Sequence, residues 1–482
     1  MPNMYFLRQF NISSLNTLFG RIITRKSKLI SILGSFLFVL FCGVSLISTV
    51  SANNSTDDWP MFHHDLSHTG YSTNTPTATS PTLLWNFTTN SVVWASPAIV
   101  NGYLYIGSDG GIAYCLNASD GTKIWNYTLA STGRGGSPIG SSMAVADGYL
   151  YFGSYDHNIY CLNASTGDKV WNYSTGNTVE SCPSIANGCL YVGSWDGNVY
   201  CLNALTGNKI WNYTTGGLLE SSPAIDSGFI YIGSTNGVVY CINAVSGENI
   251  WNYTTQKTVQ SSPTVVSSRV YIGSEDNNVY CLSAIDGTKI WNYTTPGWVD
   301  SSPAVANGCV YVGSWVEDPN QNAVASDVYC LDASTGAKIW NYTTQSGVNS
   351  SPAVAGGLMY VGGWDDNVYC LNASTGAQIM TYATGNHVNS SPAVAGGMVY
   401  VGSWDHSVYA FGMLSPGATP SPWPSPSPSP TPNLSASSKQ ATHSPSIQHS
   451  GSFPAEIIYA VIGIIIVIII VAGAIMLRRK NR

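Results

Sequence analysis

One position in each repeat of this sequence carries side chains that could bind a ligand or support acid–base chemistry. It stands just before the recurring "SSP" tripeptide and varies from repeat to repeat, whereas its neighbours barely change. Carboxylates and amides at such a position supply directed hydrogen-bond donors and acceptors. The eight residues are Trp94, Gly140, Glu180, Glu220, Gln260, Asp300, Asn349 and Asn389.

A second recurring position, two residues after the glycine of "YVGS", carries aromatic side chains: Tyr155, Trp195, Trp315, Trp364 and Trp404. Flat rings beside polar groups suit a sugar or a cation. The simpler alternative is an ordinary solvent-filled mouth whose tryptophans cover hairpin edges. We take as ligand-binding candidates Trp94, Glu180, Glu220, Gln260, Asp300, Asn349, Asn389, Trp195, Trp364 and Trp404.

Signals for metal binding or catalysis are weaker. His63, His64 and His68 form a cluster that suits either a metal or a segment capping the fold. "DPNQN" (Asp318–Asn322) is similar to the start of a Ca²⁺ loop but lacks the glycine and the distant glutamate of an EF-hand. No general base with a positioned partner stands out. We therefore assign no catalytic residue and no metal ligand.

The elements that position these residues repeat about every forty residues. Five of the seven steps between equivalent positions are 40 residues, and the others are 46 and 49, along the series Cys115, Cys161, Cys201, Cys241, Cys281, Cys330, Cys370 and Ala410. This period is typical of a four-stranded propeller blade. One unit contains four short segments with strand-like alternation, Glu180–Ala186, Cys189–Ser194, Val199–Ala204 and Ile210–Thr215, which Gly-, Asn- and Asp-rich turns separate.

The count of tryptophan motifs shows where the ring closes. An extra "LLWNFTT" around Trp85 precedes the first complete unit, and the last unit ends after its third strand, Ser407–Met413. The orphan strand can complete the last blade and remove both open edges. We predict an all-β, eight-bladed β-propeller of four-stranded antiparallel blades, closed by an N-terminal strand.

The motif "NASTGxKIWNY" resembles the tryptophan-docking motif of the pyrroloquinoline-quinone-type (quinoprotein alcohol dehydrogenase-like) propellers, and Asp58–Ser72 resembles the segment before their first blade. That family includes eight-bladed dehydrogenases and a non-enzymatic lipoprotein that helps assemble outer-membrane barrels. The resemblance covers roughly Asp58–Met413. It implies that the motif tryptophans pack on neighbouring blades: Trp85, Trp125, Trp171, Trp211, Trp251, Trp291 and Trp340.

The resemblance also raises a cofactor, pyrroloquinoline quinone (PQQ) with calcium, beside a catalytic aspartate and a disulfide between adjacent cysteines. The sequence has no Cys-Cys pair. Only Arg134 and Lys257 are expected near the variable face, too few cations for a tricarboxylate. Glu180, Glu220 and Asp300 would repel it. We expect no cofactor, and a PQQ- and calcium-dependent oxidoreductase remains the alternative.

The two ends of the chain predict a membrane-anchored surface protein. Basic residues precede the apolar run Leu29–Val50, so residues 1–52 are a signal peptide or an uncleaved membrane segment. Residues 53–82 are expected to cap the propeller, 83–413 to form it and 414–456 to form a Pro/Ser-rich stalk. Ile457–Leu477 is long enough for a single-pass transmembrane helix, and the basic tail, residues 478–482, places the C-terminus in the cytoplasm.

The net charge and the cysteine positions limit the possible partners and the possible state of the cysteines. Between Asn53 and Glu456 the chain has 9 basic and 25 acidic residues, a net charge of −16, which disfavours nucleic acid. Equivalent cysteines of adjacent blades lie about 10 Å apart, too far for disulfides, and no Cys/His spacing suggests zinc. We expect buried free thiols, which are easiest to keep on an anoxic archaeal or bacterial surface.

Sequons recur on the predicted outermost strands and are candidate N-glycosylation sites, unless one repeat simply contained a sequon that was copied. They are Asn86, Asn126, Asn172, Asn212, Asn252, Asn292 and Asn341, with further "NAS" sequons at Asn117, Asn163 and Asn372. The sequence as a whole predicts an extracellular scaffold that binds or adheres to protein or glycan partners.

Overall fold

The computed structural model describes residues 58–73, 81–130, 137–316 and 324–412. The predicted signal segment, stalk and transmembrane helix, and also Arg134 and Asp318–Asn322, lie outside these residues. The described part consists of strands and turns and contains no helix. None of its segments is therefore a helix that could cross a membrane.

Seven blades are built from four consecutive strands each. The first three are β3 (Ala98–Val100), β4 (Tyr103–Ser108), β5 (Ile112–Asn117) and β6 (Lys123–Thr128); β7 (Ala144–Ala146), β8 (Tyr149–Gly153), β9 (Asn158–Asn163) and β10 (Lys169–Ser174); and β11 (Ser184–Ala186), β12 (Cys189–Gly193), β13 (Asn198–Asn203) and β14 (Lys209–Thr214).

Blades 4 to 7 follow the same order. They are β15 (Ala224–Asp226), β16 (Phe229–Gly233), β17 (Val238–Asn243) and β18 (Asn249–Thr254); β19 (Thr264–Val266), β20 (Arg269–Ser274), β21 (Asn278–Ser283) and β22 (Lys289–Thr294); β23 (Ala304–Ala306), β24 (Cys309–Gly313), β25 (Ser326–Asp332) and β26 (Lys338–Thr344); and β27 (Ala353–Ala355), β28 (Leu358–Gly362), β29 (Asn367–Asn372) and β30 (Gln378–Ala383).

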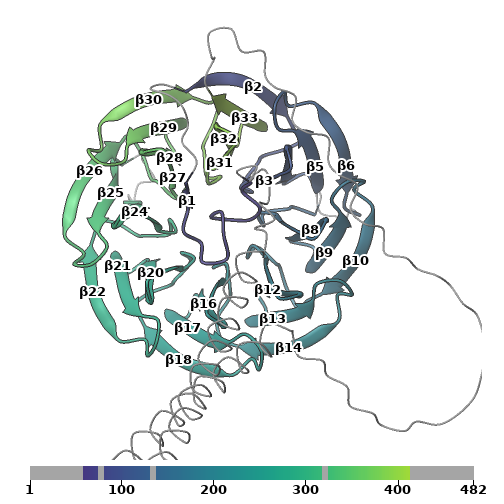
Figure 1. Cartoon of the computed structure of the whole chain (residues 1–482), viewed down its shortest axis with the longest axis horizontal. Helices are drawn as coiled ribbons and strands as arrows, with labels where there is room; N and C mark the ends of the chain where they lie inside the picture. The colour runs from purple at the N-terminus through teal and green to yellow at the C-terminus, as the bar shows by residue number, and fades with distance from the viewer. Residues whose placement is uncertain (1–57, 74–80, 131–136, 317–323, 413–482) are drawn as a thin grey trace, which may run out of the picture. The chain divides into compact units, whose positions relative to one another are not determined.

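Blade 8 joins the two ends of the propeller. It contains β31 (Ala393–Ala395), β32 (Met398–Gly402) and β33 (Ser407–Gly412), and its outermost strand is β2 (Thr82–Thr88), which pairs antiparallel with β33. Figure 1 shows the purple β2 beside the yellow-green β33. The register places Trp85 opposite Ala410, just as Trp125 lies opposite Cys115 in blade 1. The prediction of eight four-stranded antiparallel blades is confirmed.

Each motif tryptophan ties its blade to the next one. The Trp125 indole Nε1 donates to the carbonyl oxygen of Ala164 in the following blade at 3.0 Å. Its ring covers Gly167, where an added Cβ would lie 2.7 Å from the indole. The same bond, at 3.0–3.2 Å, is made by Trp85, Trp171, Trp211, Trp251, Trp291 and Trp340.

Blade 7 carries Met380 in place of the tryptophan, and the topology explains why. Blade 8 receives its outermost strand from the N-terminal side, so no turn connects its third and fourth strands. The alanine carbonyl and the glycine that receive a docking indole belong to that turn in the other blades. Because the receiving turn is missing, an indole at Met380 would have no such partner.

A closed belt of hydrogen bonds runs around the inner ends of the blades. The backbone N–H of the second serine in each "SSP" motif donates to the side chain of its counterpart in the next blade, at 2.8–3.2 Å. Cys182 occupies one place, and its thiol accepts from the N–H of Ser142. The belt closes where Ser391 donates to Ser96. The order of the eight residues is Ser96, Ser142, Cys182, Ser222, Ser262, Ser302, Ser351 and Ser391.

The segment before the propeller, Trp59–Ser72, crosses the centre of the ring and is here called the plug (Figure 1). Its backbone carbonyls accept hydrogen bonds from the N–H groups of six innermost strands, those of Ile99, Val145, Ile225, Val265, Val305 and Val354. Strand β1 (Tyr71–Ser72) pairs parallel with β27. These contacts lie toward the Asn-Gly turns of the innermost strands, so the plug covers one end of the channel and leaves the other.

The ten described cysteines are all free. Eight are buried, whereas Cys189 and Cys309 are partly exposed. Burial raises the pKa of Cys115, Cys161, Cys201, Cys241 and Cys370 to about 12. These thiols therefore behave as small apolar side chains rather than as nucleophiles or metal ligands.

The docking contact can be isolated with two glycines of almost equal φ. A Cβ added to Gly207 (φ +72°) would lie 2.7 Å from the Trp171 ring, whereas a Cβ added to Gly188 (φ +73°) would have no atom within 4 Å. Both alanine variants should lose about 1 kcal/mol for the left-handed backbone. Gly207→Ala should lose about 1–3 kcal/mol more because the indole must move. Thermal unfolding measures both; equal losses would show that the indole does not depend on close approach.

Candidate functional site at the channel mouth

The end of the channel that the plug leaves uncovered gathers acidic side chains; we call it the channel mouth. Glu180, Glu220 and Asp300 precede the innermost strands of blades 3, 4 and 6. The carboxyls of Glu180 and Asp300 lie close enough to Glu220 to raise its pKa. The structure thus brings together the three acidic residues that the sequence nominated.

Two further carboxylates join this acidic cluster. Asp109 interacts with Glu180 from blade 1, and Glu275 interacts with Glu220 and Asp300 from blade 5. Both occupy the repeat position of Trp195, two residues after the conserved strand glycine. Sequence reasoning collected only the aromatic residues at that position and missed these acids, although the repeat register contains them.

Burial raises the pKa of several carboxyl groups of this cluster. It raises the pKa of Asp300 to about 7, with a further contribution from Glu275. Burial, followed by the charges of Glu180, Asp300 and Glu275, raises the pKa of Glu220 to about 7. It raises the pKa of Asp109 to about 6, although a hydrogen bond from Trp94 opposes the rise.

Aromatic rings form a continuous wall on the other side of the mouth. Trp94 lies 4.2 Å from Trp404 between ring centroids, Trp404 lies 5.8 Å from Trp364, and Trp364 stacks on Trp315 at 5.2 Å. His387 also stacks on Trp364 at 5.2 Å. The wall therefore spans blades 6, 7, 8 and 1.

The remaining aromatic residues lie at the ends of this wall. Trp298 contacts Trp315 at 5.3 Å, and the Lys257 ammonium lies 5.7 Å from the Trp298 ring centroid. Tyr155 and Trp195 form a separate pair at 5.9 Å in blades 2 and 3. Trp298 and His387 occupy one repeat position, two residues before the variable residue that precedes "SSP". Sequence reasoning missed them because the residues at that position share no common type.

Several polar atoms at the mouth are buried without a hydrogen-bond partner. They are the indole Nε1 donors of Trp195, Trp364 and Trp404 and the Oδ1 acceptors of Asp300, Asn349 and Asn389. Such atoms lose hydration without compensation, which destabilises the free protein. All six belong to residues that the sequence nominated. Gln260, also nominated, is partly buried.

The plug histidines lie apart from this set. Burial lowers the pKa of His63 to about 3 and that of His68 to about 4. His68 contacts Ser184 through Nε2, and the His63 ring nitrogen Nδ1 contacts the His68 carbonyl. Within the described ranges, no group of three or more His, Cys, Asp or Glu side chains could hold a metal ion. His63 and His68 therefore serve here as neutral packing groups.

The sequon asparagines of the outermost strands are all exposed: Asn86, Asn126, Asn172, Asn212, Asn252, Asn292 and Asn341. By contrast, the "NAS" asparagines cap turns. The Asn163 side-chain oxygen accepts from the N–H groups of Ser165 and Thr166. The sequon asparagines of the outermost strands are therefore the ones that are accessible for N-glycosylation.

A closed ring of eight blades, tied by docking tryptophans, defines a PQQ-type β-propeller. The family model described as "Outer membrane protein assembly factor BamB" matches residues 77–138, 132–222, 196–315 and 324–415. The chain belongs to this PQQ-type β-propeller repeat family. Among curated proteins, no sequence matches it.

Solved structures with this fold include alcohol dehydrogenases and BamB. A europium-containing methanol dehydrogenase is 15% identical, covers 75% of this chain and 99% of its own, and has a TM-score of 0.65. The quinohemoprotein alcohol dehydrogenase of Comamonas testosteroni is 16% identical, covers 77% of this chain and 83% of its own, and has a TM-score of 0.65. BamB of Moraxella catarrhalis is 18% identical, covers 69% of this chain and 100% of its own, and has a TM-score of 0.59. At these identities the likeness shows the fold alone.

The residues at the mouth do not fit the quinone cofactor of the dehydrogenases. A tricarboxylate needs cations or strong donors, whereas five carboxyl groups converge here. The Lys257 ammonium, the one cation that the described residues show at the aromatic wall, lies over the Trp298 ring. The sequence also lacks adjacent cysteines.

The acidic cluster predicts a pH-dependent stability. Asp300 and Glu220 keep protons in the folded state that the unfolded chain releases near pH 4. Their stabilising contribution is complete below that pH and is lost as the pH rises through about 7. The variant Glu220→Gln with Asp300→Asn should therefore gain melting temperature relative to wild type, by about 2–4 °C at pH 8, and gain less at pH 5. A difference that is equal at both pH values would contradict the burial of these charges.

Proposed function

We propose that this protein is a non-enzymatic, membrane-anchored surface scaffold that binds a protein partner at the channel mouth. The observation that carries the proposal is the set of six buried, unpartnered polar atoms beside a continuous aromatic wall. If these side chains turn outward on binding, a partner's backbone could accept from the indole N–H groups and donate to the amide oxygens. Such bonds would offset desolvation already incurred in the free state.

The family supports a protein rather than a glycan as the partner. Its model is described as an assembly factor for outer membrane proteins, and BamB of Moraxella catarrhalis shares the fold. A surface that mixes donors, acceptors and aromatic rings is also typical of protein interfaces. A glycan partner remains an outcome that the experiment below can reveal.

The ends of the sequence support a position of the scaffold outside the cell. In this proposal residues 457–477 anchor the chain, the basic tail lies in the cytoplasm, and the Pro/Ser-rich residues 414–456 hold the propeller away from an archaeal or bacterial membrane. The exposed sequons of the outer rim would carry N-glycans, which leaves the channel mouth free for the partner.

Replacing tip tryptophans by phenylalanine tests the proposal. The variant Trp195→Phe, Trp364→Phe, Trp404→Phe keeps most of the ring area but removes three N–H donors that have no partner in the free protein. We expect an unchanged or slightly higher melting temperature. Capture of a cross-linked partner by the full-length chain in its native membrane should weaken by about tenfold or more, because each lost hydrogen bond contributes about 0.5–1.5 kcal/mol.

The matched control is Trp171→Phe, which removes a donor bonded to the Ala204 carbonyl. It should lower the melting temperature and leave capture unchanged. If the triple variant instead melts earlier and captures as wild type does, the mouth is structural and the proposal fails. If the wild-type chain captures a glycan and no protein, the partner is a glycan rather than a protein.

A further inference from the structure

The turn between the two inner strands of blade 5 departs from the other seven blades. Its two central residues are Ser267 (φ 52°) and Ser268 (φ 59°), both left-handed. The second residue is glycine in every other blade: Gly102, Gly148, Gly188, Gly228, Gly308, Gly357 and Gly397. A serine in this conformation is strained, and strain of this kind gathers at functional positions.

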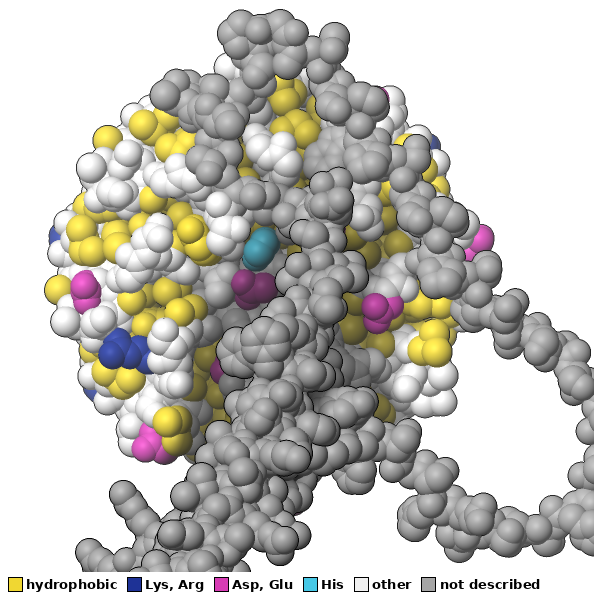
Figure 2. Space-filling model, viewed as in Figure 1, with side chains coloured by type: hydrophobic (Ala, Val, Ile, Leu, Met, Phe, Trp, Pro, Cys, Tyr) yellow, Lys and Arg dark blue, Asp and Glu magenta, His cyan; other side chains and the backbone are white. Residues whose placement is uncertain are grey.

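The next residue, Arg269, also breaks the repeat. The equivalent residues are uncharged: Tyr103, Tyr149, Cys189, Phe229, Cys309, Leu358 and Met398. Figure 2 shows that lysine and arginine side chains are few and separate on the face it displays. Arg269 therefore places a single positive charge where the fold by itself uses an apolar or aromatic side chain.

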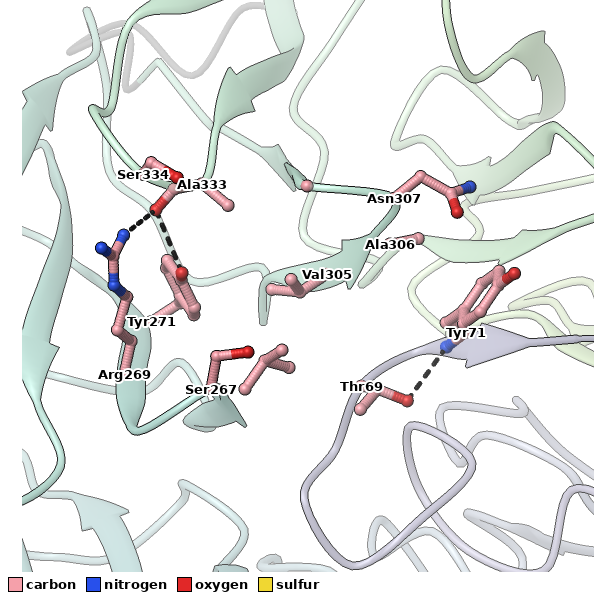
Figure 3. Close-up of a pocket in the computed structure, with 12 residues that line it drawn as sticks. Thr69, Tyr71, Ser267, Arg269, Tyr271, Val305, Ala306, Asn307, Ala333 and Ser334 are labelled. Atoms are coloured by element: carbon pink, nitrogen blue, oxygen red, sulfur yellow. Dashed lines mark hydrogen bonds between the residues drawn. The ribbon is translucent and has the colours of Figure 1, made fainter.

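A cavity of 510 Å³ adjoins this turn between blade 5, blade 6 and the plug. Val305 and Tyr71 supply apolar walls, and Thr69, Ser267 and Asn307 supply hydroxyl and amide groups (Figure 3). The Arg269 guanidinium lies at one side of this cavity. The cavity has the size and mixed lining typical of a small-molecule site.

The guanidinium is bound to an acceptor that is already saturated. The Ala333 carbonyl oxygen accepts from Trp291 Nε1 at 3.2 Å, from the Tyr271 hydroxyl at 3.0 Å and from Arg269 Nη1 at 2.9 Å. A carbonyl oxygen has two lone pairs. In blade 4 the corresponding carbonyl, that of Ala244, accepts only from Trp211 and Tyr191. The arginine is thus a surplus third donor.

Among the described residues no carboxylate forms an ion pair with Arg269, although the charge of Arg269, after the hydrogen bonds from Thr335, helps to lower the pKa of Asp332. The ion pairs of the described residues involve only His64 and His387. The nearby Asp332 uses its Oδ1 to accept from the N–H groups of Ser334 and Thr335. An oxyanion in the cavity would give the guanidinium a charge-assisted, forked pair of hydrogen bonds in place of a share in one carbonyl.

We propose that this cavity binds a small molecule with an apolar body and an oxyanion, a carboxylate or a phosphate, which Arg269 holds. Ser267, which lies on the arginine's side of Thr69 in Figure 3, would contact the oxyanion, and Val305, Tyr71, Thr69 and Asn307 would line the rest of the molecule. The site is separate from the channel mouth and does not depend on the function proposed for it. Because Thr69 and Tyr71 belong to the plug, occupancy would also tie the plug to blades 5 and 6.

The experiment measures binding of phenyl phosphate, benzoate and benzyl alcohol to the purified full-length chain by calorimetry and by the shift in melting temperature. The test variant is Arg269→Tyr, which introduces the residue that blades 1 and 2 carry at this place. Wild type should bind one or both anions, and the variant should bind them about tenfold more weakly. Phenyl phosphate and benzoate compared with each other identify the preferred oxyanion. Benzyl alcohol, which has no charge, should bind wild type and Arg269→Tyr with similar affinity.

A second variant, Ser268→Gly, introduces the glycine that the other seven blades carry and keeps both Ser267 and the arginine. It should melt at a higher temperature and still bind the anion. Should Arg269→Tyr not fold, Arg269→Lys, which keeps the charge but loses the fork, should bind more weakly than wild type. The proposal is overturned if wild type binds neither anion at millimolar concentration, or if removing the guanidinium leaves anion binding unchanged.

Discussion

The structure depends on one interaction, the hydrogen bond from a docking indole to the alanine carbonyl of the next blade. A four-stranded blade cannot bury both of its faces alone, so it must hold its neighbour at a fixed distance and tilt. The indole sets this spacing because its ring rests on a glycine that has no Cβ to keep it away. Seven such contacts, each at 3.0–3.2 Å, recur around the ring. Strand β2 supplies the contact that joins blade 8 to blade 1.

The inner belt of hydrogen bonds links the blades in addition to these tryptophan contacts. Each "SSP" motif donates a backbone N–H to the next blade, and the eighth bond returns to the first. The first serine of the motif acts both within and between blades: Ser301, for example, accepts from the N–H of Gly313 in its own blade and donates to the Ser350 carbonyl of the next. The docking tryptophans fix the outer part of the ring, and the belt fixes the inner part. The residues just before the belt therefore cannot move inward to form hydrogen bonds with one another. That rigidity explains how acids and amides remain at the mouth with unpartnered oxygens.

The same rigid repeat makes departures from it informative. Met380 replaces an indole where the receiving turn does not exist. Cys182 replaces a serine but keeps the accepting role in the belt. Ser268 and Arg269 do not follow from the topology in this way: the serine adopts a left-handed backbone, and the arginine adds a third donor to a filled carbonyl while its charge attracts Asp332. A position that weakens the repeat without a topological cause points to a role in binding.

The sequence by itself determined the blade count, the four-stranded meander, the closure by the strand around Trp85 and the positions at the mouth. These follow from local patterns, because the alternation along a strand, the turn residues and the forty-residue period are all set within one repeat. Only the tertiary structure decided which mouth residues meet. Asp109 and Glu180 are two blades apart, and the pKa of Glu220 depends on charges from three other blades. The unpartnered oxygens of Asn349 and Asn389, the belt closed by Ser391 and the three donors at Ala333 likewise depend on the radius and tilt of the closed ring. That geometry comes from packing between blades, and no single repeat contains it.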